Sequence, residues 1–312
     1  MSAGFGTRMG EIGKKLPKVI WPAFEKSILE LQVGYARSLG VESIYINLHY
    51  MSDEIMAYCK DKPIFEGVKF LVEKPEILDI GGAVHNVASQ KEVNYKGRLL
   101  VLNADQFFYL TKEDFARVLA PYKDSPFVIF NYLVNWNDGY NALDMSEERI
   151  VKGVIDKSAL KEGPKVETYN GVSLIDLSKL EKVSGPSKFF ETVCNFKKQP
   201  VVGILLDNVI YWDFGTLKRY WQTSFNIINT YRDNANHPFL RFLVNQRALK
   251  TWKINLLTGS YNSPTPNVIN LNNEPVSGDS SAPQIIMAGK AADGGGKNKI
   301  VWNGIEEIVN LS

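Results

Sequence analysis

The chain has 312 residues, of which 45% are hydrophobic and 22% are charged, and its formal net charge at neutral pH is +2. This length suits one α/β catalytic domain with an appendage, and the balanced charge argues against partners such as nucleic acid or an anionic membrane. The two cysteines, Cys59 and Cys194, lack the spacing of metal ligands, which predicts a reduced, cytoplasmic protein. The sequence predicts neither a membrane span nor a signal peptide.

The opening segment, residues 3–9, reads Ala-Gly-Phe-Gly-Thr-Arg-Met and is followed by Pro17 and Lys18. Two glycines let the backbone pass close to a bulky anion, and successive N–H groups in such a turn form a concave anion site. Arg8 can bind two oxygens at once, whereas Lys18 acts as a point charge. We therefore predict that this turn binds a polyphosphate. An ordinary glycine turn with solvated charges fits the same residues, because neither the P-loop nor the dinucleotide fingerprint is present.

Helices and strands are expected to alternate after this turn. The apolar spacing predicts helices at residues 24–39, 53–60, 81–88 and 112–120, and strands at residues 41–48, 68–73, 98–103 and 127–134. Gly40 is placed for a helix C-cap. This alternation predicts an α/β fold with a doubly wound, mostly parallel sheet. A phosphate-binding turn normally follows a buried strand, so we expect the first strand to be truncated.

The second half of the chain is less regular. Strands are expected at residues 150–155, 166–175 and 208–214, and helices at residues 187–196, 217–231 and 239–250. Residues 258–298 are rich in Gly, Ser, Asn and Pro, and short apolar islands there predict a small β appendage. Residues 300–306 look like one rung of a left-handed β-helix, although a partly ordered tail fits them nearly as well. The predicted domains are residues 1–233, the catalytic domain, and residues 234–312, the appendage.

Two aspartates follow predicted strands. Asp105 comes directly after the clearest buried strand, and Asp213 ends a later one, before Gly215 and Thr216 open a helix. Ligands of open α/β sheets bind at the carboxyl ends of the strands. Taken singly, an aspartate in a loop turn or at a helix N-cap gives the same patterns.

With Arg8, Pro17 and Lys18, the opening segment resembles the signature of the sugar-1-phosphate nucleotidyltransferases, approximately Ala-Gly-x-Gly-Thr-Arg-Leu/Met followed by Pro-Lys. The resemblance covers about residues 2–231 and is closest to enzymes like N-acetylmuramate-1-phosphate uridylyltransferase, on residues 47–50 and 168–172. It implies a Rossmann-like, GT-A-like fold. It also implies an enzyme that converts a nucleoside triphosphate and a sugar 1-phosphate to an NDP-sugar and pyrophosphate.

The resemblance implies a role for each matching residue. The nucleotide would be bound by Ala3, Gly4, Gly6, Thr7, Gly81 and Gly82. Catalysis would rest on Arg8, Lys18 and Asp105. Asp105 and Asp213 would together bind Mg²⁺, which favours carboxylates combined with substrate phosphates. The sugar phosphate would be bound by Gly139, Asn141, Asn170 and Gly171.

The sequence departs from the family pattern at four positions, where relatives often carry Thr, Gly, Trp and Pro: Ile80, Ala104, Tyr211 and Leu217. The family's Glu-Lys-Pro before the sugar segment has no clear equivalent. Its possible substitutes are Lys157, Lys161 and Lys165.

Two other functions stay open. One is a non-catalytic NDP-sugar-binding or regulatory protein on the same fold. The other is a phosphocholine cytidylyltransferase, whose substrate needs an aromatic box for its quaternary ammonium group. Candidates for that box are Tyr132, Trp136, Tyr140 and Tyr169. The expected partners are small-molecule substrates and, as a further possibility, other copies of the chain.

Overall fold

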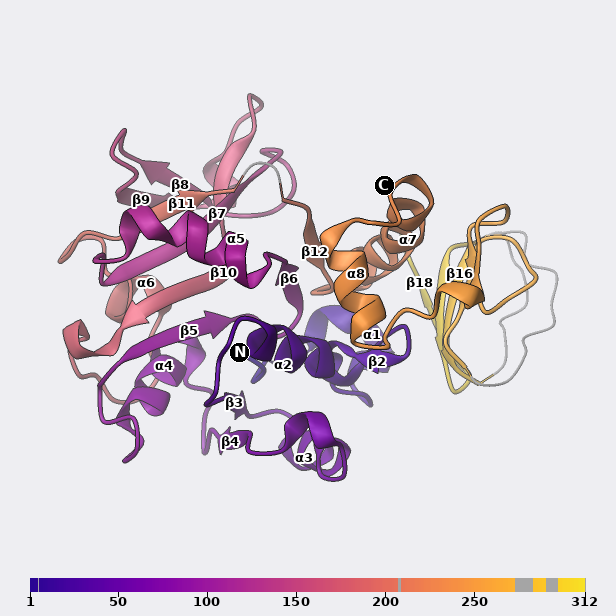
Figure 1. Ribbon diagram of the computed structural model, residues 1–312, viewed down its shortest axis with the longest axis horizontal. Coiled ribbons are helices and arrows are strands. Elements are labelled where there is room, and N and C mark those ends of the chain that lie inside the picture. The colour runs from indigo at the N-terminus through magenta and orange to yellow at the C-terminus, as the bar shows by residue number, and fades with distance from the viewer. Residues whose placement is uncertain (5, 207–208, 273–282, 290–296, 312) are drawn as a thin grey trace. The chain divides into compact units, whose positions relative to one another are not determined.

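The computed structural model describes residues 1–4, 6–206, 209–272, 283–289 and 297–311 (Figure 1). The chain forms two compact units. The first comprises Met1–Gly4, Ser43–His49 and Val68–Tyr211, and the second comprises Phe5–Glu42, Tyr50–Gly67 and Trp212–Ser312. The division of the chain into domains at residues 1–233 and 234–312 stays a prediction.

The first unit is built on a mixed four-stranded sheet in the order β11-β7-β10-β5. These strands are β5 (Arg98–Leu102), β7 (Phe127–Val134), β10 (Val166–Asp176) and β11 (Val202–Leu205). β11 is parallel to β7, whereas β10 is antiparallel to both β7 and β5. A separate parallel pair joins β3 (Tyr45–Leu48) to β4 (Lys69–Val72). The predicted α/β class with parallel strands is confirmed, and β10 adds antiparallel pairing.

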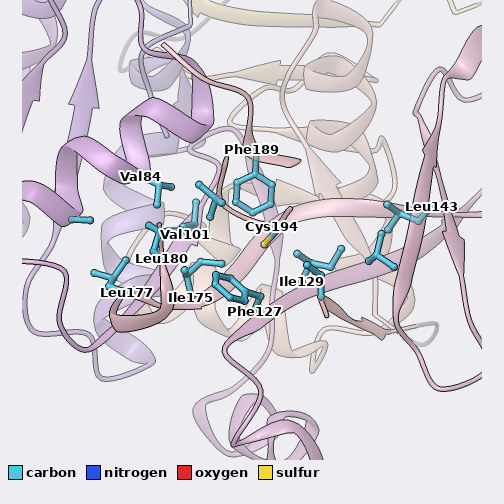
Figure 2. Close-up of a cluster of buried hydrophobic side chains, with 14 residues drawn as sticks. Val84, Val101, Phe127, Ile129, Leu143, Ile175, Leu177, Leu180, Phe189 and Cys194 are labelled. Carbon is cyan, nitrogen blue, oxygen red and sulfur yellow. The ribbon is translucent and has the colours of Figure 1, made fainter. Parts of the chain in front are cut away.

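Strand β7 shows why the four-stranded sheet is buried on both faces. Phe127 and Ile129 belong to one apolar cluster, and Val128 and Phe130 belong to another. Successive side chains of a strand point to opposite faces, so a continuous apolar run supplies two cores. Figure 2 shows the first cluster, in which Phe127 lies among side chains from several elements.

Helices supply residues to both clusters, which gives the predicted doubly wound layers. Helix α4 (Asp79–Ser89) and the short α6 (Phe189–Thr192) contribute to the first cluster. Helix α5 (Lys112–Leu119) packs against the second. Three strands complete this part of the chain: β6 (Gln106–Phe108), β8 (Ala142–Met145) and β9 (Val151–Ile155). β8 and β9 form an antiparallel hairpin, and the prediction missed β6, β8 and β11.

Met1 extends the first unit beside β5. Its amino group donates to the Leu102 carbonyl at 2.6 Å, and its carbonyl accepts from the Ala104 N–H at 3.1 Å. These bonds to residues on either side of Asn103 match one step of a parallel ladder. Met1 therefore places the next residues at the carboxyl end of β5.

In the second unit, helix α2 (Ile28–Ser38) begins four residues later than predicted. Phe24 has a φ of 63° and turns a hairpin between β1 (Pro22–Ala23) and β2 (Lys26–Ser27). Ser27 and Glu30 then form a capping box, which starts the helix. The predicted C-cap is confirmed, because Gly40 has a φ of 89° and donates to the Arg37 carbonyl.

Three other helices of the second unit match the prediction within a few residues: α3 (Ser52–Cys59), α7 (Leu217–Asp233) and α8 (Pro238–Asn245). The short α1 (Gly10–Gly13) was not predicted. Strand β12 (Tyr211–Asp213) is shorter than the predicted strand at 208–214, of which residue 208 lies outside the described residues.

Short 3₁₀ turns occur in both units. Those in the described residues are Thr7–Met9, Lys18–Ile20, Pro63–Phe65, Ala120–Tyr122, Lys157–Ala159, Leu177–Lys179 and Thr251–Lys253.

The C-terminal part forms a six-stranded sheet in chain order, which confirms the predicted β appendage. Its strands are β13 (Ile254–Asn255), β14 (Ser260–Tyr261), β15 (Val268–Asn270), β16 (Gln284–Ala288), β17 (Lys299–Trp302) and β18 (Ile305–Ile308). β14 to β17 run parallel, and the two outer pairs are antiparallel. Residues 300–306, for which a partly ordered tail was the alternative, lie in β17, β18 and the turn between them, whereas residues 273–282 and 290–296 lie outside the described residues. No helix in the described part of the chain combines the length and apolarity needed to cross a membrane.

Candidate active site

Two predicted motifs of the first unit lie side by side. Asn103 follows β5, and Gly171 lies where β10 shifts its register against β7, next to Val172, which pairs with Leu102. A β-carbon on Gly171 would lie 2.8 Å from Cγ of Asn103 and 3.0 Å from Oε1 of Gln106. Gly171 also has a φ of 86°, which favours glycine. The segment that leads to Asp105 therefore packs directly on the predicted sugar-phosphate segment.

Asn170, in the same irregular stretch of β10, has an unused donor. The residue is 1% exposed, and its Oδ1 accepts the Val172 N–H at 2.9 Å. Its Nδ2 has no hydrogen-bond partner within the part of the chain that the structure describes. Buried donors are nearly always satisfied, so this amide is suited to bind an acceptor atom of a ligand.

Asn141 joins two more segments of the first unit. Its Oδ1 accepts the Lys157 N–H at 3.0 Å, and its carbonyl accepts from the Thr168 hydroxyl at 2.7 Å. Of the three candidate lysines, Lys157 is therefore the one whose backbone is hydrogen-bonded to a predicted sugar-phosphate residue. Gly139, close by in sequence, has a φ of 78° and open space where a β-carbon would lie.

A buried network at β3 and β4 was not anticipated from the sequence. The Asn47 side chain accepts the Ser2 N–H at 2.9 Å and donates to Glu73 at 2.8 Å. Glu73, only 2% exposed, accepts the Leu78 N–H with its other oxygen. The network links Ser2, which directly precedes Ala3 and Gly4, to Leu78 at the start of α4. The sequence did carry a signal for this network, because Asn47 and Glu73 each stand near the end of an apolar strand.

Gly81 and Gly82 let a loop approach helix α4 closely. A β-carbon on Gly81 would lie 2.5 Å from the Ser187 carbonyl oxygen, and one on Gly82 would lie 2.5 Å from that of Gly185. The Gly82 N–H also donates to Ser187. Both glycines thus have a packing role, and their predicted contact with a nucleobase stays a prediction. A pocket of about 550 Å³ beside them is lined by Leu78, Gly82, His85, Asn86, Ser89, Asn94, Tyr95, Lys182, Val183, Ser184 and Gly185.

The turn that begins the second unit presents polar side chains. Phe5 lies outside the described residues, and Gly6 has a φ of 64°. Thr7 and Arg8 are exposed, whereas Met9 is fully buried and anchors the turn. Lys18 begins the next 3₁₀ turn and is half-buried.

Asp213 is buried, and its carboxylate contacts Gly215 and Arg219 in the second unit. Its Oδ1 accepts the Gly215 N–H at 2.6 Å, and its Oδ2 lies 3.1 Å from Nη1 of Arg219. The residue that caps α7 is Thr216, whose side chain accepts the Arg219 N–H. Asp213 is therefore not the N-cap of this helix, and that explanation for the residue is wrong.

The chemistry of the donor set fits a hard divalent ion. In the described ranges, no three or more His, Cys, Asp or Glu residues come together as a metal cluster. Mg²⁺ commonly takes only one or two protein carboxylates and completes its shell with water and phosphate oxygens. Asp105, in the turn after β5, and Asp213 could supply such ligands.

Neither cysteine is suited to act as a nucleophile. Both are buried and free of disulfides. Burial raises the pKa of the Cys59 thiol to about 12 and also raises that of Cys194. A buried thiol with a raised pKa is inert.

The aromatic box is only partly assembled. Tyr132 and Tyr140 have ring centroids 6.1 Å apart, and Tyr211 lies 4.3 Å from Tyr132. Tyr169 instead stacks on Phe189 at 5.3 Å, within the other apolar cluster. The expectation for Tyr169 is wrong, because its position opposite Asn131 in the ladder directs it to a different cluster.

The mixed α/β sheet and polar turns at its strand ends define a Rossmann-like nucleotide-binding protein. The sequence profile of the family described as nucleotidyl transferase matches residues 1–229, so the chain belongs to this family. Enzymes of the family generally use a divalent metal ion.

Similar proteins agree with this assignment. The D-glycero-α-D-manno-heptose 1-phosphate guanylyltransferase of Campylobacter jejuni is 25% identical over 229 residues, which are 72% of this chain and 97% of that protein. The crystal structure of HddC from Yersinia pseudotuberculosis is 22% identical, covers 72% of this chain and 95% of its own, and has a TM-score of 0.57. A UDP-glucose pyrophosphorylase complexed with UDP-glucose is 15% identical, with coverages of 74% and 96% and a TM-score of 0.57. The two structures show likeness of fold.

Proposed function

We propose that the protein is a sugar-1-phosphate nucleotidyltransferase. A phosphate oxygen of the sugar 1-phosphate attacks the α-phosphorus of a nucleoside triphosphate, and the bond from that phosphorus to the bridging oxygen breaks. Pyrophosphate leaves, and an NDP-sugar forms. The attacking oxygen is already ionised, so the reaction needs no protein nucleophile or general base. Catalysis then rests on in-line positioning and on charge stabilisation.

The observation that carries this proposal is the packing of Asn103 on Gly171. It joins the strand end that leads to Asp105 with the segment proposed for the sugar phosphate. Asn170 supplies a buried donor in this segment, and Asn141 fixes the backbone of Lys157. The Asn170 amide would donate to a phosphate oxygen, and the ammonium group of Lys157 would supply the opposite charge.

The proposed triphosphate site uses the opening turn. The exposed Arg8 and the half-buried Lys18 would stabilise the β- and γ-phosphates and the departing pyrophosphate. Ala3, Gly4, Gly6 and Thr7 would bind phosphate through backbone N–H groups and a hydroxyl. Gly81 and Gly82 would bring the backbone near the nucleobase.

We propose that Asp105 and Asp213 hold Mg²⁺, which when bound neutralises charge that develops on the phosphates. The pairing is supported by the position of each aspartate, since Asp105 follows strand β5 and Asp213 ends strand β12, and ligands of α/β sheets bind at strand ends.

Pyrophosphate release tests the proposal. GTP, UTP, CTP, ATP and dTTP are each combined with a panel of sugar 1-phosphates and with phosphocholine, with and without Mg²⁺. GTP comes first because a heptose 1-phosphate guanylyltransferase is among the similar proteins. We expect Mg²⁺-dependent release with a sugar 1-phosphate and none from Asp105→Ala.

Calorimetry with NDP-sugars distinguishes the non-catalytic alternative, which binds the NDP-sugar but never releases pyrophosphate. The ion pair between Arg219 and Asp213 favours this alternative, because it engages a proposed metal ligand. Release with phosphocholine alone would favour the cytidylyltransferase. A cytoplasmic location and a homo-oligomer also stay predictions.

A further inference from the structure

Glu307 of strand β18 contacts the segment that follows the proposed phosphate turn. Its Oε1 accepts hydrogen bonds from the backbone N–H groups of Glu11 and Ile12, the second at 3.3 Å. Glu11 and Ile12 lie 296 and 295 positions before Glu307 in the sequence, and all three residues belong to the second unit. A charged acceptor shared by two amides makes a stronger link than a neutral one.

Gly10 is shaped to admit this carboxylate. A β-carbon on Gly10 would lie 2.6 Å from Oε2 of Glu307, closer than real contacts allow. Gly10 also has a φ of 63°, which favours glycine. The Glu307 carboxylate therefore occupies space that any side chain at residue 10 would fill.

The contact lies next to the turn rather than on it. Thr7–Met9 forms the 3₁₀ turn, and the Met9 N–H donates to the Gly6 carbonyl at 2.9 Å. Met9 and Ile12 are both fully buried, so their side chains hold the segment against the apolar core. Arg8 is exposed and is left available to a ligand. Fixing residues 11 and 12 thus fixes the chain immediately beyond Arg8.

We propose that Glu307 is a positioning residue for triphosphate binding, through which the C-terminal sheet holds the Gly6–Arg8 backbone in its binding geometry. This inference rests on the proposed function of the turn. It gives the appendage a part in substrate affinity, because a residue more than 290 positions away supports the phosphate-binding segment.

The test compares three variants of the full chain. Glu307→Ala removes the acceptor, Glu307→Gln keeps a neutral one, and Glu306→Ala is the matched control. Glu306 is the exposed neighbour on β18 and pairs with Lys299 at 2.9 Å. Amide hydrogen exchange at residues 11 and 12 is measured first, because it requires no activity.

We expect exchange at these two amides to rise about tenfold in Glu307→Ala, less in Glu307→Gln, and not at all in Glu306→Ala. The KM for the nucleoside triphosphate should rise by a similar factor in Glu307→Ala. Its KM for the sugar phosphate should stay unchanged, and Glu307→Gln should recover part of the loss.

Two results would overturn the inference. One is equal exchange in Glu307→Ala and Glu306→Ala. The other is a lower triphosphate KM in Glu307→Ala, which would mean that the acid obstructs the site. If the wild-type chain releases no pyrophosphate with any substrate pair, the proposed function fails, and the exchange measurement still decides whether Glu307 holds the segment.

Discussion

Asn103 and Gly171 lie so close together that a β-carbon on Gly171 would come to 2.8 Å from Cγ of Asn103. The two residues are 68 positions apart, and the Val172–Leu102 pair of β10 and β5 brings them together. Asn103 also donates to Gln106 at 2.8 Å, across the turn that contains Asp105. The relation therefore couples the proposed metal ligand to the proposed sugar-phosphate segment.

Gly171→Ala should lower both stability and turnover. The substitution strains a residue whose φ is 86° and displaces the Asn103 side chain. We expect a loss of about 3 kcal/mol in the free energy of unfolding. Gly97→Ala is the control, since Gly97 has a φ of 75° but open space around it. It should lose about 1 kcal/mol and keep its activity. Equal losses in urea unfolding would contradict the close packing.

Gly82→Ala should act through packing on the 185–188 loop. The new methyl group would meet the Gly185 carbonyl oxygen at 2.5 Å, and backbone cannot rotate away as a side chain can. We expect about 2 kcal/mol of destabilisation. Gly153→Ala, where the nearest atom is 3.6 Å away, should change stability far less. Thermal melts of the two variants provide the measurement, and an undisturbed Gly82→Ala melt would refute the packing role.

Arg219→Gln should destabilise the ligand-free protein and increase its response to metal. Asp213 is 5% exposed, so losing the guanidinium removes a cation that lies 3.1 Å from a buried carboxylate. We expect a cost of about 2–3 kcal/mol. Mg²⁺ with a triphosphate should raise the melting temperature more in this variant than in the wild type. An equal shift in the two proteins would show that Arg219 and the metal do not share Asp213.

Glu30 should make stability depend on pH. Burial tends to raise its pKa, but the Ser27 N–H, the Tyr58 hydroxyl and the charges of Lys62 and Lys26 outweigh burial and lower it from 4.5 to about 2. The folded pKa lies below the unfolded value, so its contribution is complete above pH 4.5 and is lost as the pH falls toward 2.

The wild type should lose up to about 3 kcal/mol over this range. Glu30→Gln should flatten the curve, as followed by urea unfolding between pH 6 and pH 3, an interval that contains about 2 kcal/mol of this loss. A variant curve that stays parallel to the wild-type curve would contradict the assignment.

Local signals in the sequence were enough for much of the fold. The apolar run at residues 127–134, the cap at Gly40 and the helix after Thr216 each depend on neighbouring residues. The start of α2 was misplaced, because the left-handed Phe24 and the capping box interrupt an otherwise continuous apolar pattern.

Contacts across the chain could not be predicted in the same way. The Asn47–Glu73 pair and the Glu307 contact join residues whose identities are ordinary in their own segments. Tyr169 was a candidate for the aromatic box, but its pairing with Asn131 places it in the other cluster, and this register depends on contacts between distant segments. The motifs thus indicated which residues matter, and tertiary packing determined which of them meet.

The central claim is that Asp105 and Asp213 hold one divalent ion with the triphosphate. Binding of Mn²⁺, followed by electron paramagnetic resonance in the presence of a non-hydrolysable triphosphate, tests it most directly. We predict one ion per chain, at least about tenfold weaker binding in Asp105→Asn and in Asp213→Asn, and strong non-additivity in the double variant. Asp61→Asn, at an exposed position, should bind as the wild type does. Wild-type affinity in either Asp105→Asn or Asp213→Asn would contradict the claim.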